Sequence, residues 1–248
     1  MASGPTRRLP GLAANADAPF PPVASAWTEP NGLLAHGGDL SPVRLMHAYR
    51  AGIFPWYSDG DPILWWSPDP RAVFDTGALH LSRRQRRQWR HCDWAIRVDH
   101  DFAAVVSACA TTPRTGQPGT WILPEMQHAY ARLHQLGHAH CLSVHADGEL
   151  IGGIYGVHVD SVFCGESMFS RASGASRLAL AALCRLLQTH EVRWLDAQMP
   201  TPYLESLGVQ HCTRADYVKK LSAPPSARLP TTSWSGLIPI WTARDFAG

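Results

Sequence analysis

One carboxylate of this 248-residue chain stands among apolar and small neighbours. Glu166 lies within Cys-Gly-Glu-Ser-Met-Phe-Ser, residues 164–170, at the end of an expected strand. A carboxylate in such a stretch is a candidate pocket group that receives an ammonium or a hydroxyl. An exposed glutamate at the end of a strand would produce the same pattern. The residues by themselves favour that plainer interpretation.

Asp196 and Gln198 form a second polar pair, separated by one residue in an expected strand. Alternation along a strand places both side chains on the same face. A carboxylate beside an amide could hold and polarise a donor such as an amine. Buried polar pairs also occur in purely structural networks, and the spacing alone favours that alternative.

A third stretch, Ser170–Ser176, begins a long expected helix. Free N–H groups and the helix dipole favour an anion at such a place. The stretch partly matches the phosphate loop of acyl-CoA enzymes, but a capped loop without a ligand fits it equally well.

A basic segment supplies a candidate surface for RNA. Residues 82–90 are expected to be helical and include Arg83, Arg84, Arg86 and Arg87. Contacts between these side chains and phosphates would add salt-dependent affinity. A solvated helix surface is the alternative. We slightly favour RNA because the rest of the chain has few positive clusters.

Three histidines offer a possible metal site that the spacing does not support. His134, His138 and His140 lack the glutamate of the H-E-x-x-H pattern. The helix before them should end at Gly137, so they would not share a face. We therefore expect neither a metal nor another cofactor.

The elements that must position these residues indicate an α+β fold. Asp147-Gly148 is a strong two-residue hairpin signal between two strands. Helices are expected at 41–51, 82–90, 101–110, 124–136 and 175–190, and strands at 139–145, 150–159, 162–167 and 194–198. Strands, then a helix, then a strand inserted beside them resemble the core of the GNAT acyltransferase fold, by analogy of fold alone.

The chain divides into three predicted parts. Residues 1–18 are expected to be a flexible leader, 19–70 a small N-terminal domain, and 71–248 a GNAT-like catalytic domain. The small domain is dense in proline and glycine. We expect one helix there, capped by Ser41 and ended by Gly52. The remainder should be compact loop held by aromatic packing.

Composition narrows the class of protein. Apolar residues make up 45% of the chain and charged residues 17%, enough for a folded core. A net charge of +2 says nothing about partners. None of the six cysteines forms a C-x-x-C pair, which argues against a zinc ribbon. The sequence contains no recognisable signal peptide or apolar span, so we expect reduced thiols, a cytoplasmic location and no membrane partner.

Several segments together are similar to the leucyl/phenylalanyl-tRNA–protein transferase family. The most specific are Gly52-Ile-Phe-Pro-Trp-Tyr, Phe163 through Arg171, and Asp196-Ala-Gln. The full set covers 29–35, 37–40, 52–57, 63–71, 119–122, 129–140, 152–156, 163–171, 196–198 and 206–208.

This resemblance implies a two-domain architecture with a GNAT-like C-terminal domain. It also implies transfer of Leu or Phe, with Met as a further candidate, from aminoacyl-tRNA to proteins that begin with Arg or Lys. The product would be marked for degradation in an N-degron pathway. The aminoacyl ester is already activated, so no ATP or metal would be needed.

The resemblance also implies roles for individual residues. Asp196 and Gln198 match a proposed catalytic pair, and Glu166 matches a carboxylate near the reacting groups. Trp56 and Trp121 match aromatic residues around the 3′ adenosine. The pocket for the transferred side chain would be built by Ile154, Met168, Leu180 and Leu183.

The residues suggest one mechanism. Asp196 would orient and polarise Gln198, whose amide oxygen would hold the incoming α-amine. Asp196 and Glu166 would also attract the cationic start of the acceptor. Glutamine is a weak base, so the proton would leave through a tRNA hydroxyl or water.

The chain departs from the family pattern at two places. Tyr203 stands where relatives commonly have histidine, and Pro200 and Pro202 should stiffen the turn before it. Leu183 replaces what can be an aromatic residue. Two rival functions remain: an acyl-CoA-dependent N-acyltransferase that uses the Ser170–Ser176 stretch, and a non-catalytic RNA-binding protein.

Overall fold

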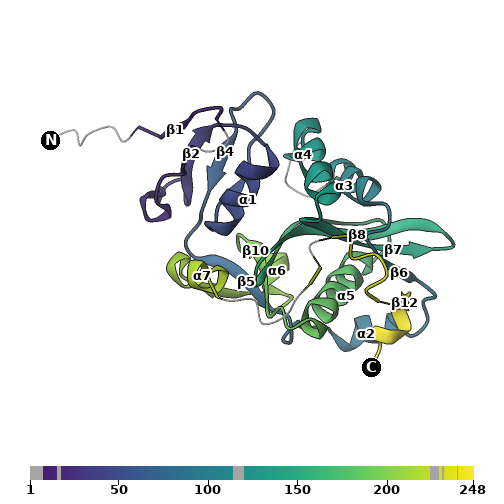
Figure 1. The fold of residues 1–248 in the computed structure, drawn as a ribbon. Coiled ribbons are helices and arrows are strands. Elements are labelled where there is room, and N and C mark those ends of the chain that lie inside the picture. The colour runs from purple at the N-terminus through teal and green to yellow at the C-terminus, as the bar shows by residue number, and fades with distance from the viewer. Residues whose placement is uncertain (1–7, 16–17, 114–119, 224–228, 231, 239) are drawn as a thin grey trace.

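The protein contains a small sheet and a large one (Figure 1). Buried apolar side chains from both parts form one core. The computed structural model describes residues 8–15, 18–113, 120–223, 229–230, 232–238 and 240–248. The small sheet has the strand order β1-β2-β4-β3, and the large sheet has the order β11-β5-β10-β9-β8-β7-β6-β12. The α+β class expected from the sequence is confirmed.

The N-terminal part is built on strands, contrary to our expectation of compact loop. β1 (Gly11–Leu12), β2 (Leu33–Gly37), β3 (Phe54–Pro55) and β4 (Leu64–Trp66) form the small sheet, and a 3-10 turn at Val23–Ser25 precedes β2. The prediction failed because strands this short leave no alternation to recognise. Aromatic packing is nevertheless present, since Trp65 is fully buried and lies edge-on to Phe20.

The helix expected in this part is confirmed. α1 spans Pro42–Arg50, Ser41 caps it by accepting from the Arg44 N–H, and Gly52 follows with φ +76°. The buried guanidinium of Arg44 donates to carbonyls of Ala13, Asn15 and Ala18. These contacts hold part of the stretch expected to be a leader, and residues 1–7 and 16–17 lie outside the described residues.

The large sheet contains the expected meander. β7 (Ala139–Ala146), β8 (Glu149–Val159) and β9 (Val162–Ser170) pair antiparallel, and Asp147-Gly148 forms the tight turn with positive φ at both residues. α5 (Ala175–Thr189) follows, and β10 (Trp194–Gln198) inserts parallel to β9. Four further strands of this sheet were not predicted from the sequence: β5 (Arg71–Asp75), β6 (Ala95–Val98), β11 (Gln210–Cys212) and β12 (Trp241–Thr242).

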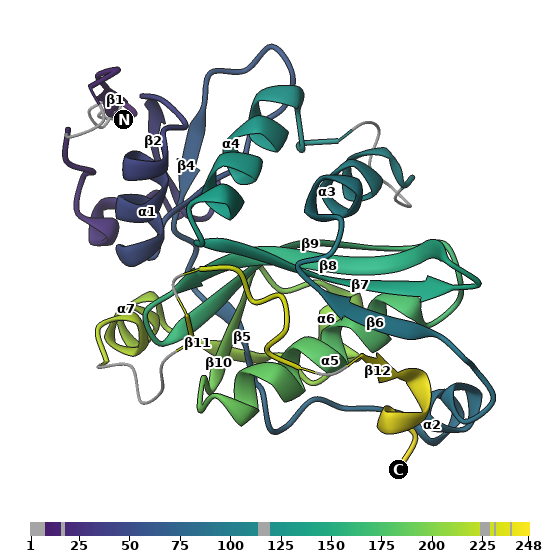
Figure 2. The same cartoon turned by 45° about the vertical axis from the view of Figure 1, so that its right-hand side comes forward.

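Helices cover both faces of the large sheet (Figure 2). α3 (Phe102–Thr111) and α4 (Pro124–Gln135) lie on one face together with α1, whereas α5 packs on the other face. The remaining helical elements are α2 (Arg83–Trp89), α6 (Pro202–Glu205), α7 (Arg214–Leu221) and a 3-10 turn at Ala243–Phe246. The sheet is therefore buried on both sides, and polar groups inside it need partners.

The parallel ladder between β9 and β10 is short. It pairs Trp194 with Val162 and ends at Asp196, which lies opposite Cys164. β10 then shifts register against β5, and Gln198 takes a left-handed φ of +64°. Residues other than glycine rarely adopt a positive φ, so this value indicates that the backbone at Gln198 is locally constrained. The two strands diverge beyond this point and leave space between them.

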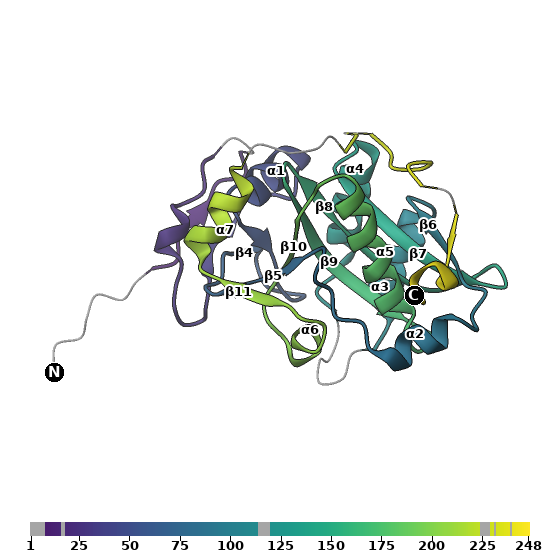
Figure 3. The same ribbon diagram turned by 90° about the horizontal axis from the view of Figure 1, so that it is seen from below.

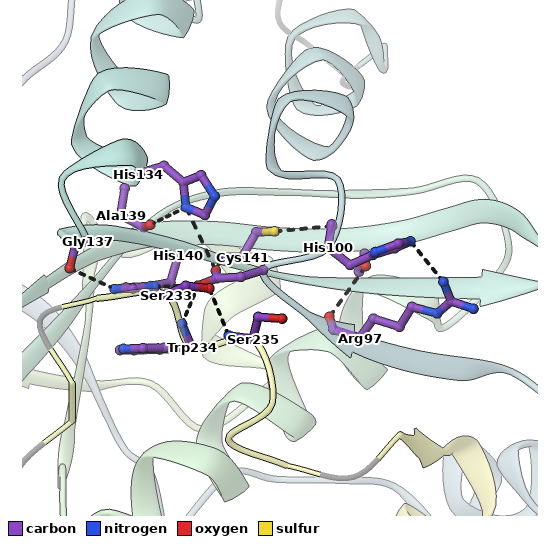
Figure 4. Close-up of polar contacts among 12 residues, drawn as sticks. Arg97, His100, His134, Gly137, Ala139, His140, Cys141, Ser233, Trp234 and Ser235 are labelled. Carbon is purple, nitrogen blue, oxygen red and sulfur yellow. Dashed lines mark hydrogen bonds and ion pairs between the residues drawn. The ribbon is translucent and has the colours of Figure 1, made fainter.

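A buried polar cluster joins the last segment of the chain to the far edge of the sheet (Figure 4). The Asp99 carboxylate accepts from the backbone N–H groups of Cys141 (3.0 Å) and Trp234 (2.7 Å), and its Oδ2 lies 2.8 Å from Nδ1 of His140. The His140 ring stacks on Trp234 at 3.8 Å. The other ring nitrogen of His140 faces the Gly137 carbonyl, so the ring lies between this oxygen and the Asp99 carboxylate. The cluster thus links the segment around Trp234 to β7.

None of the helices in the described residues is both long and apolar enough to cross a membrane. All six cysteines are free thiols, and four of them are buried.

Candidate active site

A cavity of about 340 Å³ opens where β9 and β10 diverge. Its walls come from both layers of the protein, because the gap between the strands connects the two faces of the sheet. The lining residues are Pro55, Trp56, Phe74, Trp121, Ile154, Gly165, Glu166, Ser167, Met168, Leu180, Leu195, Asp196, Ala197, Gln198, Met199, Thr201, Tyr203 and Leu204. One wall is mainly apolar, and the polar groups gather at the strand ends.

Glu166 occupies a bulge of β9 and is buried, with 9% of its surface exposed. Its Oε2 accepts a hydrogen bond of 2.6 Å from the Tyr130 hydroxyl, which lies 2.7 Å from the hydroxyl of Tyr49. Burial raises the pKa of Glu166 to about 7, although hydrogen bonds from the two tyrosines oppose this effect. The carboxyl group can therefore exchange a proton near neutral pH.

Gln198 lies against the same carboxylate. Its Nε2 donates to Oε1 of Glu166 at 3.0 Å. Because the amide nitrogen is used in this bond, the amide oxygen is the atom available to accept from a substrate. The structure thus brings together Glu166 and Gln198, which are 32 residues apart in the chain.

Asp196 is fully buried and has several partners of its own. Arg71 donates to both carboxylate oxygens, at 2.8 and 2.6 Å, and the Tyr217 hydroxyl donates at 2.8 Å. The contact with Gln198 is made to the backbone N–H, also at 2.8 Å. We expected Asp196 to act on the side-chain amide, but its contact holds the strained backbone of Gln198 instead.

Arg71 neutralises the charge of Asp196. Its guanidinium is buried and lies over the rings of Phe54 and Tyr217, at 4.8 and 4.4 Å from their centroids. Burial lowers the pKa of Arg71, but the adjacent Asp196 more than reverses this and holds the pKa above its ordinary value. This pairing leaves Glu166 as the ionisable carboxyl group of the cavity that is not matched by a cation.

The apolar wall contains three of the four predicted pocket residues. Ile154, Met168 and Leu180 line the cavity together with Phe74, Leu195 and Leu204. Leu183, one turn further along α5, is fully buried in the core and does not line the cavity. The β9 backbone places Met168 opposite Ile154 across the ladder.

The two predicted aromatic residues both line the cavity. Trp56 follows β3 and Trp121 precedes α4, and both side chains are partly exposed. Trp56 is held from behind, because Trp66 packs edge-on against it at 5.4 Å and donates its indole N–H to the Trp56 carbonyl. The cavity therefore has flat aromatic surfaces on one side and aliphatic side chains on the other.

Comparison with known proteins identifies the family of the chain. Residues 38–69 match the N-terminal domain family of leucyl/phenylalanyl-tRNA protein transferases, and residues 73–222 match the main family of the same description. The chain belongs to the leucyl/phenylalanyl-tRNA protein transferase family. A curated member from Xanthomonas euvesicatoria is 52% identical over 93% of this chain and 92% of its own. A member from Xylella fastidiosa is 52% identical over 92% and 93%.

Similarity to solved structures is weaker. A GCN5-related N-acetyltransferase from Kribbella flavida aligns with a TM-score of 0.37 at 13% identity, over 68% of this chain and 58% of that one. L-PGS from Bacillus licheniformis aligns with a TM-score of 0.36 at 10% identity, over 60% of this chain and 48% of that one. Scores this low carry no argument about the transferase.

The basic segment forms α2, with a capping box between Ser82 and Gln85. Arg83, Arg84 and Arg87 are exposed, so their guanidinium groups are available to a partner. Arg86 instead donates to the Gly248 carbonyl. Arg86 was expected to act with the other three arginines, and the contact of this helix with RNA stays a prediction.

Four residues of the site were not singled out from the sequence. Arg71, Tyr49, Tyr130 and Tyr217 support Asp196 and Glu166. Arg71 and Tyr130 lie inside segments that carry the family resemblance, so a signal for them existed. Their roles depend on contacts over as many as 125 residues of chain, which no local pattern contains.

Proposed function

We propose that this protein transfers Leu or Phe, with Met as a further candidate, from the 3′ end of aminoacyl-tRNA to proteins that begin with Arg or Lys. The observation that carries this proposal is a largely apolar cavity that is also lined by Gln198 and by the carboxyl of Glu166, whose pKa is raised. Membership of the transferase family supports it.

The cavity suits an esterified amino acid with an apolar side chain. Ile154, Met168 and Leu180 would surround that side chain, while Trp56 and Trp121 would hold the terminal adenosine. Aromatic surfaces bind bases by stacking, with little dependence on their identity. Selectivity in such a pocket is worth about 1–3 kcal/mol for each methylene-sized misfit.

We further propose that Glu166 accepts the proton of the attacking amine. The amide oxygen of Gln198 would hold the α-ammonium group beside Glu166, which takes one proton from it. The free amine then attacks the ester carbonyl carbon, and a C–N bond forms. When the bond from carbon to the ribose oxygen breaks, protonated Glu166 returns a proton to that oxygen. The nitrogen, which still carries one proton more than an amide, releases it to solvent water.

Asp196 would act by position rather than by contact with the substrate. Its bond to the Gln198 backbone fixes the direction of the amide, and Arg71 and Tyr217 hold Asp196 in place. Because Arg71 cancels its charge, Asp196 attracts the cationic acceptor less than we expected from the sequence. Glu166 in its ionised form would supply that attraction.

The outward arginines of α2 would bind the body of the tRNA. Arg83, Arg84 and Arg87 present three guanidinium groups on an exposed surface. Phosphate contacts of this kind give salt-dependent affinity without reading base sequence. We place the reaction in the cytoplasm, where its products would enter an N-degron pathway.

One assay tests the proposed function directly. Labelled Leu carried by its tRNA is incubated with the protein and a peptide that begins with Arg, and a peptide that begins with Gly serves as control. We expect label in the first peptide alone. Calorimetry with acetyl-CoA separates the acyl-CoA alternative: binding of acetyl-CoA without peptide labelling would reject the proposal.

A further inference from the structure

An exposed aromatic side chain stands at the rim of the cavity. Tyr203 lies on α6, directly after β10, and 40% of its surface is exposed although it lines the cavity. Thr201 caps α6 by accepting from the Leu204 N–H at 3.2 Å, and Pro202 occupies the first helical position. The ring is therefore presented to solvent by a constrained turn.

A guanidinium group covers this ring. Arg177 lies on α5 one turn before Leu180, which lines the cavity, so both residues face the same side of the helix. Its Cζ stands 5.2 Å from the centroid of the Tyr203 ring. Within the described residues no carboxylate lies at ion-pair distance from Arg177, in contrast to Arg71 and Arg193, which pair with aspartates. The charge of Arg177 is thus available to a ligand.

The same edge of the molecule leads to the basic helix. The side chain of Gln88 on α2 donates to the Ser173 carbonyl at 2.7 Å, just before α5 begins. On the other side, the His80 N–H, just before α2, donates to the carbonyl of Leu207, just after α6. Figure 3 shows α2 and α6 along one edge. Arg177 and Tyr203 therefore lie between the cavity and the exposed arginines of α2.

We infer that Arg177 and Tyr203 bind the nucleotide that precedes the terminal adenosine of the donor tRNA. The Arg177 guanidinium contacts the phosphate that joins the two nucleotides, and the exposed face of Tyr203 stacks on the preceding base. This inference rests on the proposed function. A phosphodiester is favoured over the acceptor protein as ligand, because the acceptor begins with positive charges that Arg177 repels.

Two donors of different length test this contact. Aminoacyl-adenosine carries the ester and the terminal base but no phosphate, whereas aminoacyl-tRNA carries both. For Arg177→Gln we expect the KM for aminoacyl-tRNA to rise about tenfold, as for loss of one charged hydrogen bond, while the KM for aminoacyl-adenosine stays unchanged. A plot of the logarithm of the tRNA binding constant against the logarithm of the salt concentration should become less steep by about 0.7, the value for one phosphate of a single strand.

The tyrosine is tested in the same way. Tyr203→Ala should raise the KM for aminoacyl-tRNA and spare aminoacyl-adenosine, whereas Tyr203→Phe keeps the ring and should behave as the native protein. Arg132→Gln, which alters an arginine on α4, is the matched control for loss of one charge and should change neither KM. Thermal unfolding of every variant checks that the fold is retained.

Other outcomes would overturn this inference. An equal rise of KM for both donors would mean that Arg177 contacts the adenosine or the amino acid instead. A rise confined to the acceptor peptide would assign the surface to the acceptor protein. If the native protein used neither donor, the proposed function itself would fail, which distinguishes the two conclusions.

Discussion

Replacing Glu166 with Gln should make the protein more stable and less active, and the size of the first effect follows from the structure. Burial raises the pKa of this carboxyl from an ordinary 4.5 to about 7. Each unit corresponds to about 1.36 kcal/mol. Ionising Glu166 therefore costs the folded protein about 3 kcal/mol more than the unfolded chain.

The sign of this effect depends on pH. Between pH 4.5 and about 7 the unfolded chain has released the proton of Glu166, but the folded protein still holds it. The free energy of unfolding therefore falls as pH rises through this range, and the full cost is present above about pH 7. The side-chain amide of the E166Q variant does not ionise, so this variant should gain up to about 3 kcal/mol relative to the native protein at about pH 8.

Urea denaturation at several pH values measures this difference. The native and E166Q free energies of unfolding are compared at about pH 4.5, 6, 7 and 8. We expect the advantage of E166Q to grow with pH up to about pH 7 and then to level off. Gln135→Ala, which changes an exposed side chain of α4 without removing a titratable group, is the control and should give a difference that is independent of pH. A constant difference for E166Q would refute the assignment of a raised pKa.

Activity should change in the opposite direction. Single-turnover transfer under saturating substrates should fall about 10²- to 10⁴-fold in E166Q, the range for loss of a general base. The native rate should rise with pH through about 7 as Glu166 loses its proton. The acceptor amine also titrates, near about 7.7–8.0, and E166Q isolates that contribution. A variant with native rates would remove Glu166 from proton transfer.

Four further predictions concern other parts of the protein. Asp196→Asn leaves the buried Arg71 without its charged partner, so thermal unfolding should show that the protein loses about 3–5 kcal/mol of stability. Transfer should also cease, and a variant that still catalyses transfer would reject the positioning role of Asp196. Leu180→Phe narrows the cavity, so competition assays should show the kcat/KM for Phe falling about tenfold relative to that for Leu. An unchanged ratio would mean that the side chain of the transferred amino acid binds elsewhere. Reversing the three exposed arginines of α2 to Glu should weaken tRNA binding and flatten its salt dependence, and an unaltered slope would exclude α2 from the interface. Burial raises the pKa of Asp99, but hydrogen bonds led by that to His140 outweigh this effect and hold the pKa below its ordinary value. The stability advantage of the native protein over Asp99→Asn should therefore be complete above about pH 4 and shrink as the pH is lowered further. An advantage that stays constant as the pH is lowered would contradict this.

Local rules predicted the elements that have strong local signals. Ser41, Pro42 and Gly52 predicted both ends of α1, because capping and positive φ depend on a few adjacent residues. Asp147-Gly148 predicted the β7–β8 turn for the same reason. The small sheet was missed, because strands of two to five residues with proline and glycine between them have no detectable period.

The candidate site was predicted as a set of residues and not as an arrangement. Glu166, Asp196 and Gln198 were named from their segments, and all three line one cavity. The partners differ from expectation, because Asp196 pairs with Arg71 and contacts the backbone of Gln198. Alternation along a strand placed the two residues on one face, but the register shift after Asp196 changes that geometry.

The sequence by itself therefore determined which residue types are available, where helices α1 to α5 and strands β7 to β10 begin and end, and which family the chain resembles. Only the tertiary structure decided that β9 and β10 separate after Asp196, that Glu166 is buried beside two tyrosines, and that Arg71 cancels the charge of Asp196. The physical reason is distance along the chain. Helix caps and turns depend on neighbouring residues, whereas burial and charge pairing depend on groups that only the folded chain brings together.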